Sequence, residues 1–223
     1  MSEGLTLRPA LAAVDHLLLA VPDLDAGIAW LEERCGVRAA LGGSHPGRGT
    51  RNALLSLGDR RYLEILAPDP AQANVTSSLL ELTQVSAPTL ARWAATGRDL
   101  AGFAARLRAD AEPGVTIGEP QDGGRTTPAG TELRWRTVSA RGAAIAALGG
   151  LAPFFIEWSP ETAHPALDAP RIGTLEGLRF EHPDPETAIG TLASLGLSVA
   201  VAAGPRARLR ASIRTPRGIL DLD

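Results

Sequence analysis

Two polar side chains interrupt segments that otherwise have the pattern of buried strands. His16 lies in AVDHLLLA at 13–20, and Glu64 lies in RYLEILA at 61–67. Side chains alternate between the two faces of a strand, so His16 shares a face with Leu18, and Glu64 shares one with Tyr62. Burying an imidazole or a carboxylate without a partner costs free energy. We therefore expect both groups to point to each other, to a metal ion, or into a water-filled cleft.

Three further polar residues could take part in chemistry at such a cleft. Glu157 lies in the apolar segment PFFIEW at 153–158, and His45 lies in the glycine-rich segment GGSHPGRGT at 42–50. His45 acts as an acid, a base or an extra ligand, or it is a loop histidine that binds backbone carbonyls. Asn52 either binds a substrate or fastens the loop. The GRGT stretch precedes a strand and not a helix, so it is not a phosphate-binding loop.

These residues belong to a repeated order of elements. The pattern predicts a strand at 13–20, a helix at 24–34 that Asp23 caps, and three strands at 37–41, 51–58 and 61–67. The same β-α-β-β-β order recurs with a strand at 89–96, a helix at 100–109, a strand at 115–118, a loop at 121–130, and strands at 132–140 and 153–158. A shorter third copy begins at 174–181, continues with a helix at 185–195, and ends in three strands.

The repeat divides the chain into three modules and predicts an α+β fold. The modules span residues 10–68, 86–159 and 172–223. A βαβββ unit has a curved mixed sheet with its helix on the outside, so two paired units enclose a cup between their inner faces. His16 and Glu64 are expected to face that cup. Trp93, Trp135 and Trp158 lie on the predicted strands, and each either packs in the core, the commoner role for a single tryptophan, or lines an aromatic pocket for a small molecule.

A set of short motifs extends over nearly the whole chain and is most specific through residue 165. It comprises Val14-Asp15-His16-Leu17, Val21-Pro22-Asp23-Leu24, His45-Pro46-Gly47-Arg48-Gly49-Thr50, Asn52-Ala53-Leu54, Tyr62-Leu63-Glu64, and Ile156-Glu157-Trp158 followed by His164-Pro165. These motifs resemble the glyoxalase-like domain of the vicinal oxygen chelate superfamily, the group of glyoxalase, bleomycin-resistance and dioxygenase-like folds. The resemblance implies paired βαβββ modules, a concave site and, in many members, one divalent metal held by the first and last strands of two modules.

Carried over by position, the resemblance implies a metal site made of His16, Glu64 and Glu157. One imidazole and two carboxylates suit Zn, Fe, Mn or Ni and leave positions open for substrate oxygens. The fourth position is occupied by Arg92, which has no lone pair to donate to a metal. In the alternative, the Arg92 guanidinium replaces the metal, pairs with Glu64 or Glu157, and contributes to a metal-free pocket that binds a small organic ligand.

Two functions follow from these alternatives. The first is a metal-dependent lyase, isomerase or dioxygenase that acts on a small oxygen-rich substrate, with Glu157 and His45 as catalytic groups and Arg92, Asn52, Trp93 and Trp158 as substrate-binding residues. The second is a metal-free protein of the same fold that sequesters a small molecule. The odd number of modules leaves one inner face uncovered, and this predicts a homodimer.

The composition of the chain limits the classes of partner and cofactor that we expect it to bind. The 223-residue chain has a net charge of -3 and all of its cationic side chains are arginines, so we expect no nucleic acid, no anionic membrane, no lysine Schiff base and no Walker-type nucleotide site. Cys35 is the single cysteine and is expected to be a buried small hydrophobe. Residues 1–9 lack the pattern of a signal peptide, and no apolar stretch is long enough for a membrane span. These features predict a cytoplasmic protein without a nucleotide cofactor.

Overall fold

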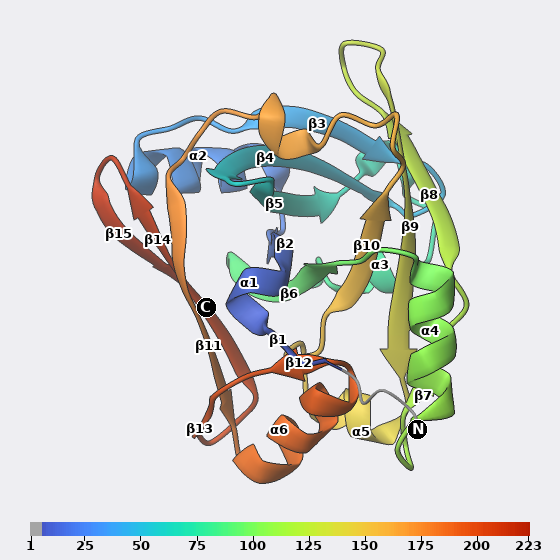
Figure 1. Ribbon diagram of the computed structural model, residues 1–223. Helices are drawn as coiled ribbons and strands as arrows, with labels where there is room; N and C mark the ends of the chain where they lie inside the picture. The colour runs from blue at the N-terminus through green and yellow to red at the C-terminus, as the bar shows by residue number, and fades with distance from the viewer. Residues whose placement is uncertain (1–5) are drawn as a thin grey trace.

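The first repeat unit has the β-α-β-β-β order that the sequence predicts, but its second strand spans 40–45 and not 37–41. Part of the glycine-rich segment at 42–50, which was expected to be a loop, is therefore paired in the sheet. The computed structural model describes residues 6–223 (Figure 1); residues 1–5, part of the segment on which the expectation of no signal peptide depends, lie outside the described range. The unit consists of β2 (Val14–Ala20), α2 (Leu24–Cys35), β3 (Ala40–His45), β4 (Thr50–Gly58) and β5 (Arg61–Pro68). Asp23 caps α2 by accepting a hydrogen bond from the backbone N–H of Ala26 at 2.9 Å. Gly36 ends the helix with φ of 79°.

The second unit contains one more strand than the sequence suggests. It consists of β6 (Thr89–Thr96), α4 (Leu100–Ala109), β7 (Thr116–Ile117), β8 (Gln121–Thr126), β9 (Glu132–Arg141), the short helix α5 (Ala143–Ala147) and β10 (Phe154–Trp158). The expected loop at 121–130 is wrong over 121–126, because these polar and glycine-rich residues pair with β9 along their whole length. Strand pairing here overrides a weak local propensity.

The two units join into one sheet. Its strand order is β3-β4-β5-β2-β6-β10-β9-β7, with β8 paired to β9. β2 and β6 meet antiparallel at the centre, and each is followed on its outer side by a parallel neighbour, β5 or β10. The units are therefore related by an approximate two-fold axis near the paired residues Leu17 and Trp93. The α+β class with mixed sheets is confirmed.

The third unit forms a separate sheet that covers the other side of the central strands. Its elements are β11 (Thr174–His182), α6 (Pro185–Ser194), β12 (Leu197–Ser198), β13 (Val201–Ala203), β14 (Arg208–Thr215) and β15 (Gly218–Leu222), with the sheet order β13-β11-β14-β15. Phe180 packs edge-on against Trp93 with ring centroids 6.1 Å apart. Figure 1 shows this sheet beside the long sheet of the first two units.

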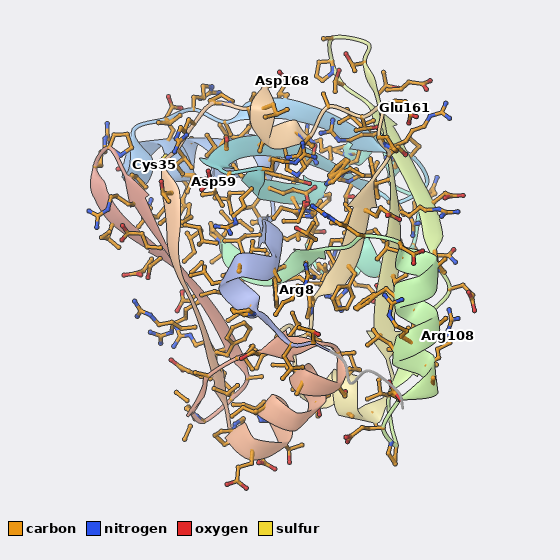
Figure 2. All side chains as sticks on the ribbon, in the orientation of Figure 1. Arg8, Cys35, Asp59, Arg108, Glu161 and Asp168 are labelled. Atoms are coloured by element: carbon orange, nitrogen blue, oxygen red, sulfur yellow. The ribbon has the colours of Figure 1, made fainter. Side chains whose placement is uncertain are left out.

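The remaining elements are short connections. They are β1 (Arg8–Pro9), which pairs with β12, the helices α1 (Ala10–Ala13) and α3 (Ser78–Glu81), and the 3-10 turns η1 (Pro70–Gln72) and η2 (Pro165–Leu167). Cys35, at the end of α2, is fully buried, as expected for a small hydrophobe (Figure 2). Within residues 6–223, no helix combines the length and the apolar character needed to cross a membrane.

Side-chain alternation along the central strands separates a core from a cavity. Leu17 and Leu19 of β2 belong to the main hydrophobic core, together with Leu63 and Ile65 of β5. The intervening side chains of these strands point to the opposite side of the sheet. That opposite side forms the cup, and α2 and α4 lie on the outer side of their units.

Candidate active site

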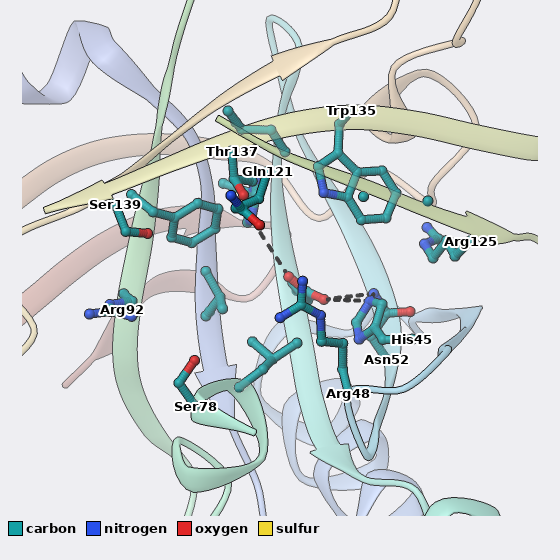
Figure 3. Close-up of a pocket in the computed structure, with 18 of the residues that line it drawn as sticks. His45, Arg48, Asn52, Ser78, Arg92, Gln121, Arg125, Trp135, Thr137 and Ser139 are labelled. Atoms are coloured by element: carbon teal, nitrogen blue, oxygen red, sulfur yellow. Dashed lines mark hydrogen bonds and ion pairs between the residues drawn. The ribbon is translucent and has the colours of Figure 1, made fainter. Parts of the chain in front are cut away.

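A cavity of about 330 Å³ occupies the inner face of the long sheet (Figure 3). Strands β2, β3, β4, β5, β6, β8, β9 and β10 contribute side chains to its wall, and the loop after β3 and helix α3 border it. Six of the residues that the sequence singled out line this cavity: His16, Glu64, His45, Asn52, Arg92 and Trp158. Two others, Trp93 and Glu157, do not.

The Glu64 carboxylate lies at the centre of the polar part of the cavity. It is 6% exposed. Its Oε1 accepts a 2.6 Å hydrogen bond from the amide Nδ2 of Asn52. The Nε2 atoms of His16 and His45 lie 3.6 Å from Oε2 and Oε1, respectively. A buried carboxylate with two imidazoles this close is a group that can exchange protons with a ligand in the cavity.

His45 holds Asn52 in place and has no free nitrogen. Asn52 Nδ2 can only donate, so the Nε2 of His45, 3.2 Å away, is the acceptor. The ring proton is then on Nδ1, which donates to the Thr50 hydroxyl at 2.9 Å. Burial lowers the pKa of His45, although the charge of Glu64 opposes this effect, and the neutral ring that this pattern requires is favoured. Gly42 lies against Asn52 Oδ1, and a Cβ at residue 42 would collide with it.

His16 is oriented from behind by Asp15. The Nδ1–H of His16 donates to Asp15 Oδ1 at 2.8 Å, and this contact directs Nε2 toward Glu64. Asp15 Oδ2 also accepts hydrogen bonds from Trp158 Nε1 at 3.1 Å and from His164 Nε2 at 3.3 Å. Burial on its own raises the pKa of Asp15, but the hydrogen bonds and charges of the two histidines outweigh it and lower the pKa from 3.8 to about 2.

Aromatic rings fix the plane of the His16 imidazole. Tyr62 stacks on it with a centroid distance of 4.5 Å, and Phe154 contacts it edge-on at 5.5 Å. Burial raises the pKa of Tyr62 well above 10, with Glu64 and Asp15 adding to the effect, so its hydroxyl keeps its proton. The two aromatic contacts hold the imidazole in the orientation that points Nε2 toward Glu64.

The structure corrects the role expected of Glu157. Phe154, Ile156 and Trp158 of β10 face the cavity, so the alternating residue Glu157 points to the other side. There its carboxylate accepts hydrogen bonds from the backbone N–H groups of Asp99 at 2.6 Å and Leu100 at 3.3 Å, at the start of α4. It lines a second cavity, of about 390 Å³, and not the one that contains Glu64.

Strand register identifies the true counterparts of His16 and Glu64 in the second unit. Leu18 pairs with Glu64 in the first unit, and Ala94, related to Leu18 by the approximate two-fold axis, pairs with Phe154. The same axis relates His16 to Arg92. The four positions that the resemblance assigns to metal ligands therefore hold His16, Glu64, Arg92 and Phe154.

This donor set does not fit a divalent metal. A guanidinium and a phenyl ring occupy two of the four positions, and neither can coordinate a cation. The amide of Asn52 fills the space between His45 and Glu64. Within residues 6–223, no group of three or more histidine, cysteine, aspartate or glutamate side chains is arranged to hold a metal ion. The expected site of His16, Glu64 and Glu157 does not assemble.

The Arg92 side chain also differs from the expectation. It was expected to pair with Glu64 or Glu157, but it makes no ion pair or side-chain hydrogen bond with any residue in the range 6–223, and its Nε is buried without a partner. Burial lowers the pKa of Arg92. The neighbouring Trp93 is fully buried in the core on the opposite side of β6, where its Nε1–H donates to the Leu151 carbonyl at 2.8 Å. Its expected place in the pocket is therefore wrong, and Trp135 of β9 lines the cavity together with Trp158.

Sequence reasoning missed two further groups at the site. Asp15 directly precedes His16 in an apolar strand, so its buried charge was a visible signal. Arg125 lies in the segment that was expected to be a loop. It is 7% exposed, and its guanidinium donates to the carbonyl of Gly42. Burial lowers the pKa of Arg125, while Glu64 and Tyr62 oppose the effect. Arg125 lines the same cavity as Glu64, so it adds positive charge to that cavity.

The model of one protein family, described as the glyoxalase-like domain, matches residues 14–196. The chain belongs to this family. The match confirms the resemblance to the glyoxalase-like domain over most of the chain, including both units that form the cavity. No curated protein sequence is significantly similar to this glyoxalase-like protein.

Several solved structures are similar to this glyoxalase-like protein. A hypothetical protein from Staphylococcus aureus is 13% identical with a TM-score of 0.68, over 94% of this chain and 98% of that one. Methylmalonyl-CoA epimerase from Mycobacterium tuberculosis is 21% identical with a TM-score of 0.48, over 72% of this chain and 97% of that one. The Streptomyces coelicolor epimerase, in complex with 2-nitronate-propionyl-CoA, is 19% identical with a TM-score of 0.45, over 65% and 95%. At its identity of 13%, the Staphylococcus aureus structure shows a shared fold alone.

Proposed function

We propose that this glyoxalase-like protein is a lyase or isomerase that transfers a proton on a small oxygen-rich molecule without a metal ion. The observation that supports it is the buried Glu64 carboxylate, which faces the cavity between two imidazoles. Structural stability gives no reason to place a carboxylate there, because burying a charge is costly. Such a group is typical of general acid–base catalysis.

In the proposed reaction, Glu64 is the base. The C–H bond next to a substrate carbonyl breaks, its proton passes to the Glu64 carboxylate, and the electron pair moves into the carbonyl to give an enolate oxygen. Arg125 supplies positive charge near this oxygen. His16, with its free Nε2 3.6 Å from Glu64, takes or returns the proton. Asn52 orients Glu64, and His45 acts by positioning Asn52.

In many members of the family a metal ion would bind and polarise the substrate oxygens. The residues of this cavity do not provide a complete set of ligands for such an ion. The dioxygenase reaction that was expected beside lyase and isomerase activity therefore has no support from these residues. The expected homodimer stays a prediction.

Hydrogen exchange in D2O tests the proposal. A panel of small 2-oxo acids and 1,3-dicarbonyl compounds is incubated with the protein and a chelator, and loss of the proton next to the carbonyl is followed by NMR. We expect exchange with wild type and a loss of about 10²- to 10⁴-fold in Glu64→Gln. Glu157→Gln is the matched control, because it removes the same charge outside the cavity. Equal exchange in wild type and Glu64→Gln, or no exchange with any member of the panel, contradicts the proposal.

A metal-free binding protein is the second candidate. The Arg92 guanidinium, which has no partner among residues 6–223, favours it, because a cation at the wall of a cavity can hold a ligand whether or not a reaction follows. This candidate predicts saturable ligand binding that Glu64→Gln leaves intact, with no exchange into the ligand in D2O.

A further inference from the structure

The arginines of the cavity outnumber its carboxylates. Arg48, Arg92, Arg125 and Arg141 line it, against Glu64 and Asp122. The Asp122 carboxylate is 89% exposed and pairs outside the cavity with Arg136 at 3.2 Å. Glu64 is therefore the one buried carboxylate that faces these guanidinium groups within the described part of the chain. The cavity has an excess of positive charge that this part of the chain leaves unneutralised.

Among these arginines, Arg92 combines partial burial with the lack of an acceptor for its guanidinium in the described part of the chain. Arg125 has the Gly42 carbonyl as an acceptor, whereas the Arg92 side chain has no acceptor among residues 6–223, and its Nε is shielded from water. A guanidinium removed from water without an acceptor loses hydration and gains nothing in return. An oxyanion that binds it in a bidentate manner would supply both the charge and the acceptors.

The position of Arg92 suits a ligand that also reaches Glu64. Glu64, Leu18 and Arg92 are paired in a row across β5, β2 and β6. Two strand spacings separate the backbones of Glu64 and Arg92, about 10 Å, and both side chains extend into the cavity between them. Thr137 and Ser139 of β9 add hydroxyl groups to the same wall (Figure 3). A small molecule with an anionic end at Arg92 can present a carbon a few bonds away to Glu64.

We propose that Arg92 binds an oxyanion of the substrate, a carboxylate or a phosphoryl group, and so defines the ligand of this cavity as a small anion. The inference rests on the proposed function for the reaction that follows binding, but not for binding itself. It assigns Arg92 as the residue that determines specificity for anionic ligands.

Calorimetric titration of the full chain tests this inference. The probes are malonate, inorganic phosphate and the neutral analogue malonamide, at constant ionic strength. We expect wild type to bind malonate, phosphate or both, and the tighter of the two indicates a carboxylate or a phosphoryl ligand. Malonamide should not bind. Arg92→Met should weaken anion binding about 10- to 100-fold, and Arg92→Lys, which keeps the charge but not the fork of donors, should lie between the two.

Arg134→Met is the matched control. Arg134 is 73% exposed, pairs with Glu132 and lies outside the cavity, so its replacement should change the anion affinity less than twofold. Without added anion, Arg92→Met should unfold at a temperature equal to or above that of wild type, because it removes a partly buried charge whose Nε has no acceptor among residues 6–223. The inference is overturned if wild type binds neither anion, if Arg92→Met and Arg92→Lys bind as tightly as wild type, or if malonamide competes equally.

The same titration separates this inference from the proposed function. Glu64→Gln should retain anion binding, because Arg92 and not Glu64 holds the ligand. Anion binding that depends on Arg92, together with no proton exchange in D2O, refutes the proposed reaction and leaves the ligand class intact. If proton exchange depends on Glu64 but wild type binds no anion, the proposal of an anionic ligand is refuted and the proposed reaction is not.

Discussion

Replacing Asp15 with asparagine tests whether the buried network behind His16 stabilises the fold. The carboxylate of Asp15 is 2% exposed and accepts hydrogen bonds from three N–H groups, those of His16, Trp158 and His164. Asparagine has almost the same shape but offers one oxygen in place of two. Its amide N–H groups would face at least one of the three donors, and that donor would lose its acceptor.

The expected loss of folding free energy can be calculated in two ways. The pKa of Asp15 falls from 3.8 to about 2 on folding, and each pKa unit corresponds to about 1.4 kcal/mol, so the charged form is worth about 2 kcal/mol of stability. A buried N–H group left without an acceptor costs about 1–3 kcal/mol. Both routes describe the same contacts, so we expect a total loss of about 2–3 kcal/mol at pH 7. For a chain of this length, that loss lowers the melting temperature by about 4–12 °C.

Urea unfolding followed by tryptophan fluorescence measures the difference as a function of pH. Because the pKa of Asp15 is lower in the folded than in the unfolded protein, its contribution is complete above the unfolded value of 3.8 and is lost as the pH falls toward about 2. The stability gap between wild type and Asp15→Asn should therefore be constant from pH 7 to about pH 5 and should narrow between pH 4 and 2. Asp168→Asn, an exposed aspartate without such contacts, is the control and should change stability by less than about 0.5 kcal/mol.

Two results would refute this reasoning. If Asp15→Asn were as stable as wild type at pH 7, the hydrogen bonds from His16, Trp158 and His164 would contribute nothing net. If the gap were large but did not change with pH, the loss would come from packing and not from the carboxylate charge.

Two other predictions follow from the geometry of the site. Glu157→Gln should lower the free energy of unfolding by about 1 kcal/mol, because the Glu157 carboxylate caps the start of α4. Proton exchange and anion binding should stay as in wild type. A loss of exchange or of binding with unchanged stability would contradict this and place Glu157 in the cavity. Treatment with EDTA should leave the melting temperature unchanged, because the second-unit positions equivalent to His16 and Glu64 hold Arg92 and Phe154, which cannot bind a metal. A lower melting temperature, together with stoichiometric release of a metal measured by elemental analysis, would contradict the assignment of these positions.

The sequence alone determined the first unit and half of the site. The period of two along each strand groups His16 with Leu18 and Glu64 with Tyr62, because it is a local property of a strand. The pairing of Leu18 with Glu64 then puts both groups on the same side of the sheet. The cap Asp23 and the terminating Gly36 similarly determine α2 from its own residues. His45 and Asn52 reach Glu64 because His45 ends β3, Asn52 lies two residues into the paired strand β4, and β4 is the neighbour of β5.

Only the tertiary structure decided which way β10 faces. Phe155 and Ile156 are 1% and 2% exposed, so both faces of this strand are buried and its apolar pattern does not distinguish the core from the cavity. The sequence therefore did not exclude Glu157 from the cup. In the structure, Glu157 lies on the other side of the sheet and binds the backbone N–H groups at the start of α4.

The partners of charged groups also depended on distant parts of the chain. His164 contacts Asp15 across 149 residues, and Arg125 binds the Gly42 carbonyl across 83. Local propensity contains no information about such contacts, because they form only when separate strands are brought into register. For the same reason, the sequence showed that Arg92 could not be a metal ligand, but only the assembled sheet showed that Arg92 has no carboxylate to pair with among the described residues.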